Sequence, residues 1–251
     1  MHNIQWNNFS LDSYGVRIER SPEIIRPRRK YDVLSIPGRN GDFVLMQDAW
    51  ENYIQPYEVF IGDGSNLSAE TTANTLSYFL HSANGYALLE DTFEPNIYRY
   101  AYYVDETDIY NGLTQYGRTT LRFNCRPERY LRTSEEAVQN GDFLTGPYSY
   151  LHNGAKPRII INAGGVSWGG TFKVVTTDKT YELQLTGVQG RIILYCEEQD
   201  ATNNNGDNLN DKVTILQGDS YPRLDPNGST ITWTISGTSP TVSMDPRWFY
   251  I

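Results

Sequence analysis

Short apolar runs separated by turn residues recur along most of the chain. In TITWTIS, at residues 230–236, isoleucine and tryptophan alternate with threonine, which is typical of a strand with one buried face. Other runs are rich in β-branched and aromatic residues and end at Gly, Pro, Asn or Asp. The pattern predicts strands at residues 14–19, 31–36, 43–47, 57–61, 86–90, 98–105, 119–125, 158–162, 171–176, 181–185, 191–196, 212–216, 230–236 and 241–244.

One segment has the spacing of a helix instead. Between residues 68 and 82 the apolar side chains fall on one helical face. Ser68 is placed to cap the N-terminus, and Asn84-Gly85 supplies a stop signal at the other end. The residues that form the apolar face are Ala69, Ala73, Leu76, Phe79 and Leu80.

The strand pattern fades into charged residues around Glu128 to Asn140, which predicts a boundary between two domains, 1–134 and 135–251. In the first domain the single helix is expected to cover one face of a sheet. In the second, short and evenly spaced strands favour a β-sandwich or jelly roll. The predicted fold class is therefore mainly β, with an α+β N-terminal domain that contains one helix.

Charge narrows the range of partners. The 251 residues include 21 basic and 30 acidic side chains, giving a net charge of −9 and a pI of about 4.9. Stable binding to nucleic acid or to an anionic membrane requires a basic surface, so neither is expected. The N-terminal sequence lacks the apolar core of a signal peptide, and no run approaches transmembrane length. We expect synthesis in the cytoplasm and a soluble product.

Candidate chemistry is sparse. Cys125 and Cys196 both end strand-like runs and are expected to be reduced and partly buried. The three histidines lie in no metal-binding or nucleophile motif. The sequence therefore predicts neither an enzyme nor a bound cofactor or metal ion.

Two polar segments keep alternatives open. Glu90, Asp91 and Glu94 cluster in LLEDTFEPN, which suits a glycosidase acid pair, although such clusters before proline more often form a capped turn. The loop at residues 197–211 is rich in oxygen ligands, but its spacing does not match a calcium loop. A long solvated loop is the favoured interpretation.

Trp168 is the candidate sugar contact. It lies in GGVSWGGTF, where the flanking glycines leave room for an exposed aromatic platform. A sugar site in a β-sandwich needs such a platform together with converging polar groups. Trp233 alternates with isoleucine and is expected in the core.

The segment SIPGRNGDF, at residues 35–43, contains two turn signals, Pro-Gly and Asn-Gly, between apolar runs. Asn-Gly in this setting predicts a tight hairpin. The segment lacks the glycine spacing and the following helix of a phosphate loop. Basic residues precede and occupy the turn, so the hairpin either docks into an acidic neighbour or carries a solvated tip. Docking predicts a subunit interface formed by Arg28, Arg29, Arg39, Asn40 and Gly41.

Four segments resemble, in order and spacing, the distal tail protein (Dit) family of siphophages, the phages with long non-contractile tails. The segments are SIPGRNGDF, GYALLEDTFEPNIYRYAYY, LRFNCRPERYL and SYPRLDPNGSTITWTISGTSPTVSMDPRWFYI. The last contains the family's Pro-Arg-aromatic motif at Pro246, Arg247 and Trp248. The resemblance extends along nearly the full chain.

The resemblance implies a structural virion protein at the phage tail tip. Its first domain would form a homo-oligomeric ring, usually a hexamer, that links the tail tube protein to the tail-associated hub or tip protein. Its second domain would be a galectin-like β-sandwich that faces outward, where receptor-binding or baseplate proteins attach. No catalytic residues are implied. Two alternatives remain, a carbohydrate-binding module that recognises the host cell wall and a tail enzyme that cleaves peptidoglycan.

Overall fold

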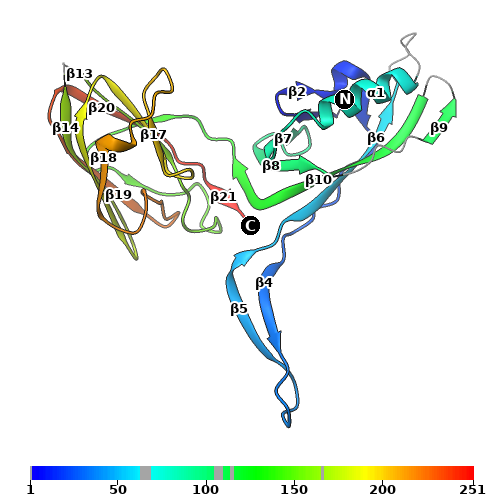
Figure 1. Cartoon of the computed structure of the whole chain (residues 1–251), viewed down its shortest axis with the longest axis horizontal. Helices are drawn as coiled ribbons and strands as arrows, with labels where there is room; N and C mark the ends of the chain where they lie inside the picture. Colours follow the sequence, from blue (N-terminus) through cyan, green and yellow to red (C-terminus); the bar gives the residue numbers. More distant parts are fainter. Residues whose placement is uncertain (1, 63–68, 105–109, 114–115, 165–166) are drawn as a thin grey trace. The chain divides into compact units, whose positions relative to one another are not determined.

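The computed structural model describes residues 2–62, 69–104, 110–113, 116–164 and 167–251 (Figure 1). The chain divides into two compact units. Unit 1 comprises Met1–Tyr130 together with Ile251, and unit 2 comprises Leu131–Tyr250. The predicted boundary at residue 134 lies slightly further along the chain than this division. The ring-forming and galectin-like characters assigned to the two domains remain predictions.

Unit 1 is built on an antiparallel sheet. Its two longest strands, β6 (Tyr53–Ile61) and β10 (Tyr116–Leu131), pair with each other. Their antiparallel register runs from Gly117↔Ile61 to Cys125↔Tyr53. Along the sheet the strands lie in the order β2 (Phe9–Ser10), β1 (Ile4–Trp6), β7 (Ala87–Asp91), β8 (Ile97–Tyr103), β10 (Tyr116–Leu131), β6 (Tyr53–Ile61) and β3 (Val16–Ile18). A further strand, β9 (Tyr110–Leu113), pairs with β10.

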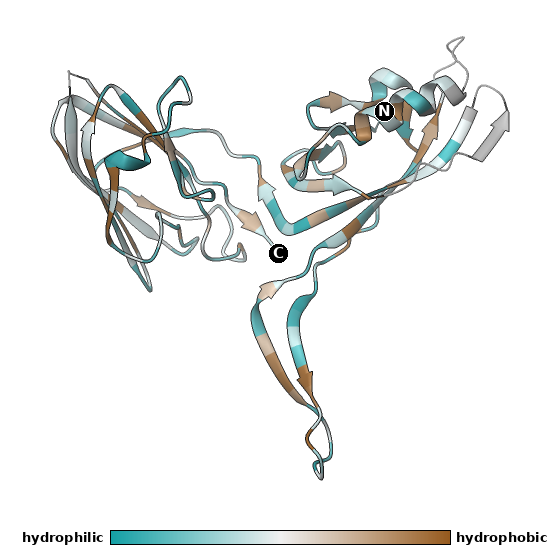
Figure 2. Ribbon diagram, viewed as in Figure 1, coloured by the Kyte–Doolittle hydropathy of each residue, from teal (hydrophilic) through white to brown (hydrophobic). Residues whose placement is uncertain are grey.

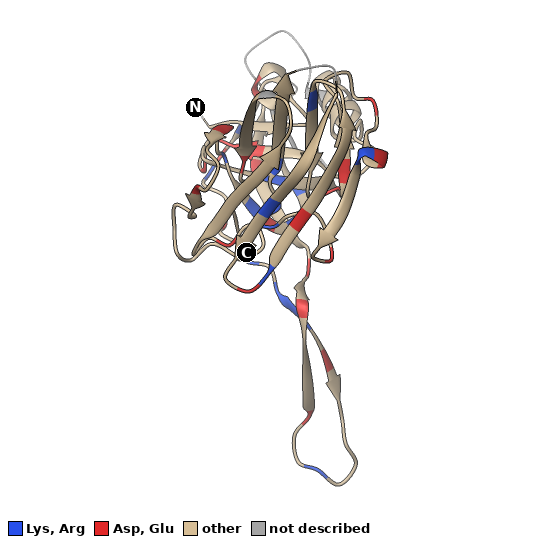
Figure 3. Ribbon diagram, turned by 90° about the vertical axis from the view of Figure 1, so that its left-hand side faces the viewer, with Lys and Arg blue, Asp and Glu red and all other residues tan. Residues whose placement is uncertain are grey.

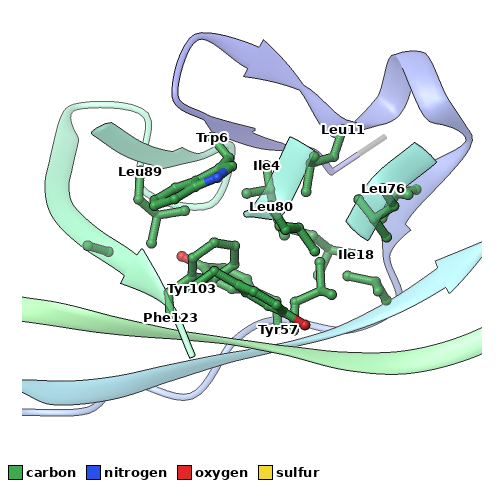
Figure 4. Close-up of a cluster of buried hydrophobic side chains, with 14 of the residues drawn as sticks. Ile4, Trp6, Leu11, Ile18, Tyr57, Leu76, Leu80, Leu89, Tyr103 and Phe123 are labelled. Atoms are coloured by element: carbon green, nitrogen blue, oxygen red, sulfur yellow. The ribbon is translucent and has the colours of Figure 1, made fainter. Parts of the chain in front are cut away.

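One face of this sheet carries the core of unit 1 (Figure 4). Alternate residues of β6 are buried because successive side chains of a strand point to opposite faces. The ring of Phe123 on β10 lies 5.0 Å from the ring of Trp6 and 6.0 Å from that of Tyr57, measured between centroids. Such large buried rings contribute much of the apolar area removed from water on folding.

The predicted helix is confirmed as α1 (Ala69–Leu80). Leu76 and Leu80 are buried in the core, and Phe79 packs between the rings of Phe9 and Tyr14. Gly85 has φ +107°, but it lies five residues beyond the end of α1 at Leu80, so the predicted stop signal does not cap the helix directly. Ser68, the predicted cap, lies outside the described residues.

A separate two-stranded sheet belongs to unit 1. It consists of β4 (Arg29–Leu34) and β5 (Phe43–Trp50), which pair antiparallel. Figure 1 shows this hairpin extending away from the main sheet. Only Glu51 and Asn52 separate β5 from β6, so the hairpin leads directly into a long strand of the main sheet.

Unit 2 contains two five-stranded antiparallel sheets. Alternating residues such as Ile159, Ile161, Phe172 and Val174 are fully buried, so each sheet has one apolar face in the core of a β-sandwich. One sheet has the order β11 (Glu136–Val138), β20 (Thr238–Asp245), β13 (Arg158–Gly164), β16 (Arg191–Tyr195) and β17 (Asp200–Thr202). The other has β12 (Phe143–Leu144), β19 (Ser229–Ile235), β14 (Trp168–Thr176), β15 (Thr180–Val188) and β18 (Val213–Gln217).

Every strand predicted from the sequence overlaps a strand of the structure, which confirms a mainly β fold. The predictions missed the shorter strands, since two to four residues are too few to establish a periodicity. The long strands were also underestimated, because Pro56 interrupts the apolar pattern of β6. Pro56 is tolerated where β6 pairs with β10, beyond the part paired with β3. The missed strands are β1, β2, β9, β11, β12, β17 and β21 (Phe249–Tyr250).

The reactivity of the two cysteines tests whether the cores of the two units are buried as described. Both thiols are free, as predicted, and they are fully buried where partial burial was expected. Burial raises the pKa of Cys125 from 9.0 to about 12, and it also raises the pKa of Cys196. The reactive species is the thiolate. At pH 8 we therefore expect both cysteines of the folded protein to react with a thiol reagent about a thousandfold more slowly than in the unfolded chain.

Absorbance assays with an aromatic disulfide reagent, with and without denaturant, measure this difference. Two fast equivalents of thiol in the folded protein would contradict the described burial. The same reaction in denaturant is the control, since it releases both cysteines from their cores.

Candidate assembly interface

The β4–β5 hairpin exposes apolar side chains along its length (Figure 2). All six residues of β4 and the first six of β5 are exposed. The large apolar side chains have exposed fractions between 37% and 61%, although the surrounding sequence resembles that of buried strands. They are Tyr31, Val33, Leu34, Ile36, Phe43, Val44, Leu45 and Met46.

Both faces of the hairpin are apolar. In the register, Val33 lies opposite Val44, and Leu34 lies opposite Phe43. These neighbouring pairs point to opposite faces because side chains alternate along a strand. Continuous apolar runs are typical of strands covered on both sides. Unit 1 covers neither face, and a contiguous apolar surface of this kind marks an interaction site.

The loop at the tip differs from the tight hairpin predicted from Asn-Gly. Leu34 pairs with Phe43, so residues 35–42 all lie in the loop. Its one hydrogen-bonded turn uses Pro-Gly instead: the amide of Arg39 donates to the carbonyl of Ile36 at 3.1 Å. Gly38 has φ +80°, which a type II turn requires at this position. The prediction failed because the stronger local signal was the preceding Pro-Gly.

The five predicted interface residues lie on this hairpin, at its two ends. Arg39, Asn40 and Gly41 are exposed at the tip. At the base, the guanidinium of Arg28 lies 4.5 Å from the centroid of the Tyr31 ring, and Arg29 Nε donates to the carbonyl of Gln47 at 2.9 Å. The structure thus brings the basic residues to either end of the apolar stretch (Figure 3). It does not gather them into one patch.

The apolar residues between these ends were not selected from the sequence. The signal for them was the apolar run FVLM at the start of β5, together with Val33 and Leu34 at the end of β4, which in the sequence is typical of buried strands. Only the structure shows that no other element of unit 1 packs on them. The hairpin surface, defined by those eight apolar residues with Arg28, Arg29 and Arg39, is the candidate assembly interface.

A strap at residues 21–25 leads from β3 toward the hairpin and closes a cavity of about 180 Å³ against the sheet. The side-chain amide of Gln55 donates to the carbonyl of Glu23 at 3.1 Å, which ties the strap to β6. Asp91, Glu94 and Arg99 line the same cavity. The strap that precedes the hairpin is therefore held against the main sheet by a polar contact.

The carboxylates around this cavity are committed to hydrogen bonds and ion pairs. Asp91 accepts from the hydroxyl of Tyr57 at 2.8 Å and from Arg99 at 3.3 Å. Burial raises the pKa of Tyr57 well above its ordinary value, so its hydroxyl remains a donor. Glu94 also pairs with Arg99, and it lies 3.5 Å from Arg129.

The capped-turn interpretation of LLEDTFEPN is confirmed. Asp91 Oδ1 accepts from the amides of Phe93 and Glu94 at 2.9 and 3.0 Å. An Asx turn of this kind explains the acidic cluster without a catalytic role. A glycosidase would need a pair of carboxyl groups facing a substrate, whereas Asp91 is buried beneath the strap.

Trp168 does not form the exposed platform expected of it. Its side chain is 2% exposed, and its indole nitrogen donates to the carbonyl of Gly190 at 2.7 Å. A register shift between Trp168 and Gly170 marks a bulge in β14. At Gly170, a Cβ atom would lie 2.0 Å from the carbonyl oxygen of Thr234, so a close backbone contact explains the glycine. The glycines allow tight packing around the ring, and the sugar-contact prediction loses its basis.

The loop at residues 197–211 is organised by its own polar side chains. Asn203 Oδ1 accepts from the amides of Asn205 and Asp207, and Asp200 accepts from the side chains of Asn208 and Asn210. Within the described residues, no group of three or more His, Cys, Asp or Glu side chains is arranged to hold a metal ion. In the same part of the chain, no helix combines the length and hydrophobicity needed to cross a membrane.

The sequence matches no protein-family model and no curated protein. Its architecture, a sheet domain with one helix and an exposed hairpin followed by a β-sandwich, is instead found among solved structures of phage tail hubs and baseplates. A chain described as the Dit protein of phage SPP1, from a hub adsorption apparatus in phages that infect Gram-positive bacteria, has a TM-score of 0.67 and 14% sequence identity. That match covers 100% of this chain and 98% of the SPP1 chain.

Two chains from the activated baseplate of phage P2 are also similar. One, from the structure with calcium, has a TM-score of 0.58 and 12% identity and covers 97% of each chain. The other, with strontium, has a TM-score of 0.50 and 12% identity and covers 97% of this chain and 96% of that one. At such low identity these matches establish a shared fold. They confirm the resemblance to Dit at the level of the fold.

The buried ion pairs beneath the strap should contribute strongly to stability. Replacing Arg99 by alanine leaves Asp91 buried without its charged partner, and breaking a buried pair in this way costs about 3–5 kcal/mol. We therefore expect Arg99→Ala to lower the free energy of unfolding by that amount, measured by urea denaturation.

Arg118→Ala is the matched control. Arg118 pairs with Glu19 at 2.8 Å, but both side chains are partly or largely exposed, so its loss should cost about 1 kcal/mol or less. Equal effects of the two substitutions would show that the Arg99 network adds nothing beyond an ordinary surface pair.

Proposed function

We propose that this protein is a structural component of a phage tail tip, where its first unit assembles into a ring that links the tail tube protein to the hub or tip protein. The observation that carries the proposal is the hairpin with two uncovered apolar faces. A two-stranded hairpin is at best marginally stable in water by itself. Such a hairpin is suited to insertion between other protein surfaces.

A second copy of this chain is the occupant that fits the hairpin surface. The chain has a net charge of −9, whereas the base and tip of the hairpin carry Arg28, Arg29 and Arg39. The tip loop also carries Asp42, so the basic end is the base of the hairpin, where Lys30 follows the two arginines. A basic end on an otherwise acidic molecule favours docking of the hairpin onto another copy. The hairpin and its acceptor are different surfaces, so the contact is heterologous, and repetition by rotation closes a ring. Six copies are our proposal, in line with the resemblance to Dit.

The remaining partners follow from the same proposal. The ring of unit 1 would contact the tail tube and the hub or tip protein, and unit 2 would receive receptor-binding or baseplate proteins. Support comes from the shared fold with proteins of the SPP1 hub and the P2 baseplate. The protein would therefore reside in the virion. An acidic ring would not retain the DNA that passes through it.

The proposal includes no catalytic activity. The acidic cluster that suited a hydrolase forms a buried structural network. Recognition of a host wall through Trp168 is not favoured either, because the indole ring is enclosed.

The apolar side chains of the hairpin should control assembly. Leu34→Asp places a charge on one face of the hairpin, where burial against a second copy would require desolvating it. We expect the native mass, measured by light scattering after size exclusion, to fall from that of a closed oligomer to that of the monomer. Electron micrographs of the wild-type peak should show rings.

Leu216→Asp is the control for this substitution. Leu216 lies in unit 2 and is 55% exposed, compared with 49% for Leu34. It should leave the mass unchanged, and both variants should retain the monomer's circular dichroism. A Leu34→Asp protein that still forms rings, or a wild type that stays monomeric at all concentrations even with the tube protein, would refute the interface.

The tip arginine should make assembly sensitive to salt. Arg39→Gln removes the positive charge from the loop, so we expect weaker association by about three- to tenfold at low salt and a smaller effect of added salt. Lys179→Gln, which removes an exposed charge paired with Asp219 in unit 2, should change neither quantity. Sedimentation velocity over a range of salt concentrations measures both. Identical salt dependence in wild type and Arg39→Gln would assign Arg39 to a solvated tip.

A further inference from the structure

Asn-Gly pairs recur along the chain, and each can undergo a spontaneous chemical change. The backbone nitrogen of the glycine can attack the side-chain amide carbon of the asparagine, because glycine has no Cβ to hinder the approach. The seven pairs begin at Asn40, Asn84, Asn111, Asn140, Asn153, Asn205 and Asn227. Asn111 lies in strand β9, whereas the other six lie in turns or loops. Among these six, hydrogen bonding of the glycine amide distinguishes reactive pairs from protected ones.

In four of the six pairs the glycine amide already donates a backbone hydrogen bond. The donors and their carbonyl acceptors are Gly141 and Ile231 at 2.8 Å, Gly154 and Leu224 at 3.0 Å, Gly206 and Asn203 at 3.2 Å, and Gly228 and Asp225 at 3.0 Å. Asn140 is restrained further, because its side chain donates to the carbonyl of Trp233 at 2.9 Å and accepts from the amide of Trp233 at 3.0 Å. An amide held in this way must first break its hydrogen bond, which slows the attack.

The pair Asn40-Gly41, in the tip loop of the hairpin, lacks these restraints. Both residues are exposed, and among the described residues none accepts a hydrogen bond from the amide of Gly41. The hydrogen-bonded turn of this loop closes one residue earlier, at the amide of Arg39. The Gly41 nitrogen is therefore available to react with the side chain of Asn40.

The pair Asn84-Gly85 is an intermediate case. Within the described part of the chain, the amide of Gly85 also donates to no acceptor. Its neighbours are anchored, however: Ala83 packs against the core of unit 1, and the guanidinium of Arg126 lies 4.5 Å from the centroid of the Tyr86 ring. Because the attack requires local rotation of the backbone, we expect Asn84 to react more slowly than Asn40.

We propose that Asn40 is a site of spontaneous deamidation, through which the hairpin tip acquires a negative charge. The Gly41 nitrogen bonds to Cγ of Asn40 and closes a succinimide ring. The side-chain nitrogen leaves as ammonia and takes the proton of the Gly41 amide. Water then opens the ring at one of its two carbonyls, which gives aspartate or isoaspartate. Water is the co-reactant, and no electrons are transferred.

The new charge changes the balance of the tip loop. At residues 35–42 the charges of Arg39 and Asp42 cancel, so deamidation leaves the loop with a net negative charge. If the hairpin docks onto another acidic copy, the added charge weakens that docking. This consequence rests on the proposed assembly, whereas the reaction itself depends on the single chain.

The test follows each Asn-Gly pair in the full-length protein during incubation at mildly alkaline pH, by digestion and mass spectrometry. Asn140 is the matched internal control, since both sites read Asn-Gly-Asp. In the folded protein we expect Asn40 to convert about tenfold faster than Asn140, because one hydrogen bond contributes about that factor. In denaturant the two rates should become similar.

Equal rates at Asn40 and Asn140 in the folded protein would overturn the proposal. A difference that persists unchanged in denaturant would overturn it as well, since the cause would then be local sequence instead of the fold. Asn40→Gln keeps a neutral amide with a longer side chain, and it should abolish the conversion at this position.

Asn40→Asp reproduces the charged product and tests its effect on assembly separately. We expect this variant to associate about three- to tenfold more weakly than the wild type at low salt, measured by sedimentation velocity, whereas Asn40→Gln should associate normally. Unchanged association of Asn40→Asp would overturn the effect on assembly. A wild type that forms no oligomer would refute the proposed ring, and the conversion rates would still decide whether Asn40 is the modification site.

Discussion

The pairing of β6 with β10 is the contact on which the other parts of unit 1 depend. Its register runs without interruption from Tyr53 to Ile61. One face of the pair carries Tyr57 and Phe123 into the core, where α1 covers them. At the start of β6 the chain comes from the hairpin, and at the end of β10 it enters unit 2. The β6–β10 pair therefore joins the hairpin to the core of unit 1, and its second strand leads along the chain into unit 2.

Local patterns were sufficient for the strands and the helix, because periodicity reflects which face is buried. The local patterns did not show which other part of the structure covers the apolar face of each element. The apolar runs of the hairpin and those of the β-sandwich look alike in sequence, yet Phe172 is enclosed and Phe43 is exposed. That difference depends on whether another layer of the same chain lies opposite. Among the described residues of unit 1, no layer lies opposite the hairpin, so its apolar side chains remain exposed in the single chain.

The errors at individual residues have a similar origin. Glycines around Trp168 suggested open space, but Gly170 is required because the backbone of β19 approaches closely. Asn-Gly suggested the turn of the hairpin, but the hydrogen-bonded turn forms at Pro-Gly. Asp91 lay in an acidic cluster that looked available for chemistry, and its partners Tyr57 and Arg99 come from other strands. In each case a contact distant in sequence determined the role of a locally ambiguous residue.

The stacked rings of Tyr148, Tyr150 and Tyr250 are a further contact that the sequence alone does not reveal. Tyr148 and Tyr150 are close in sequence, but the third ring comes from Tyr250 on β21, a strand that pairs with β10. In both units, contacts between segments distant in sequence decide which apolar side chains are buried and which stay exposed.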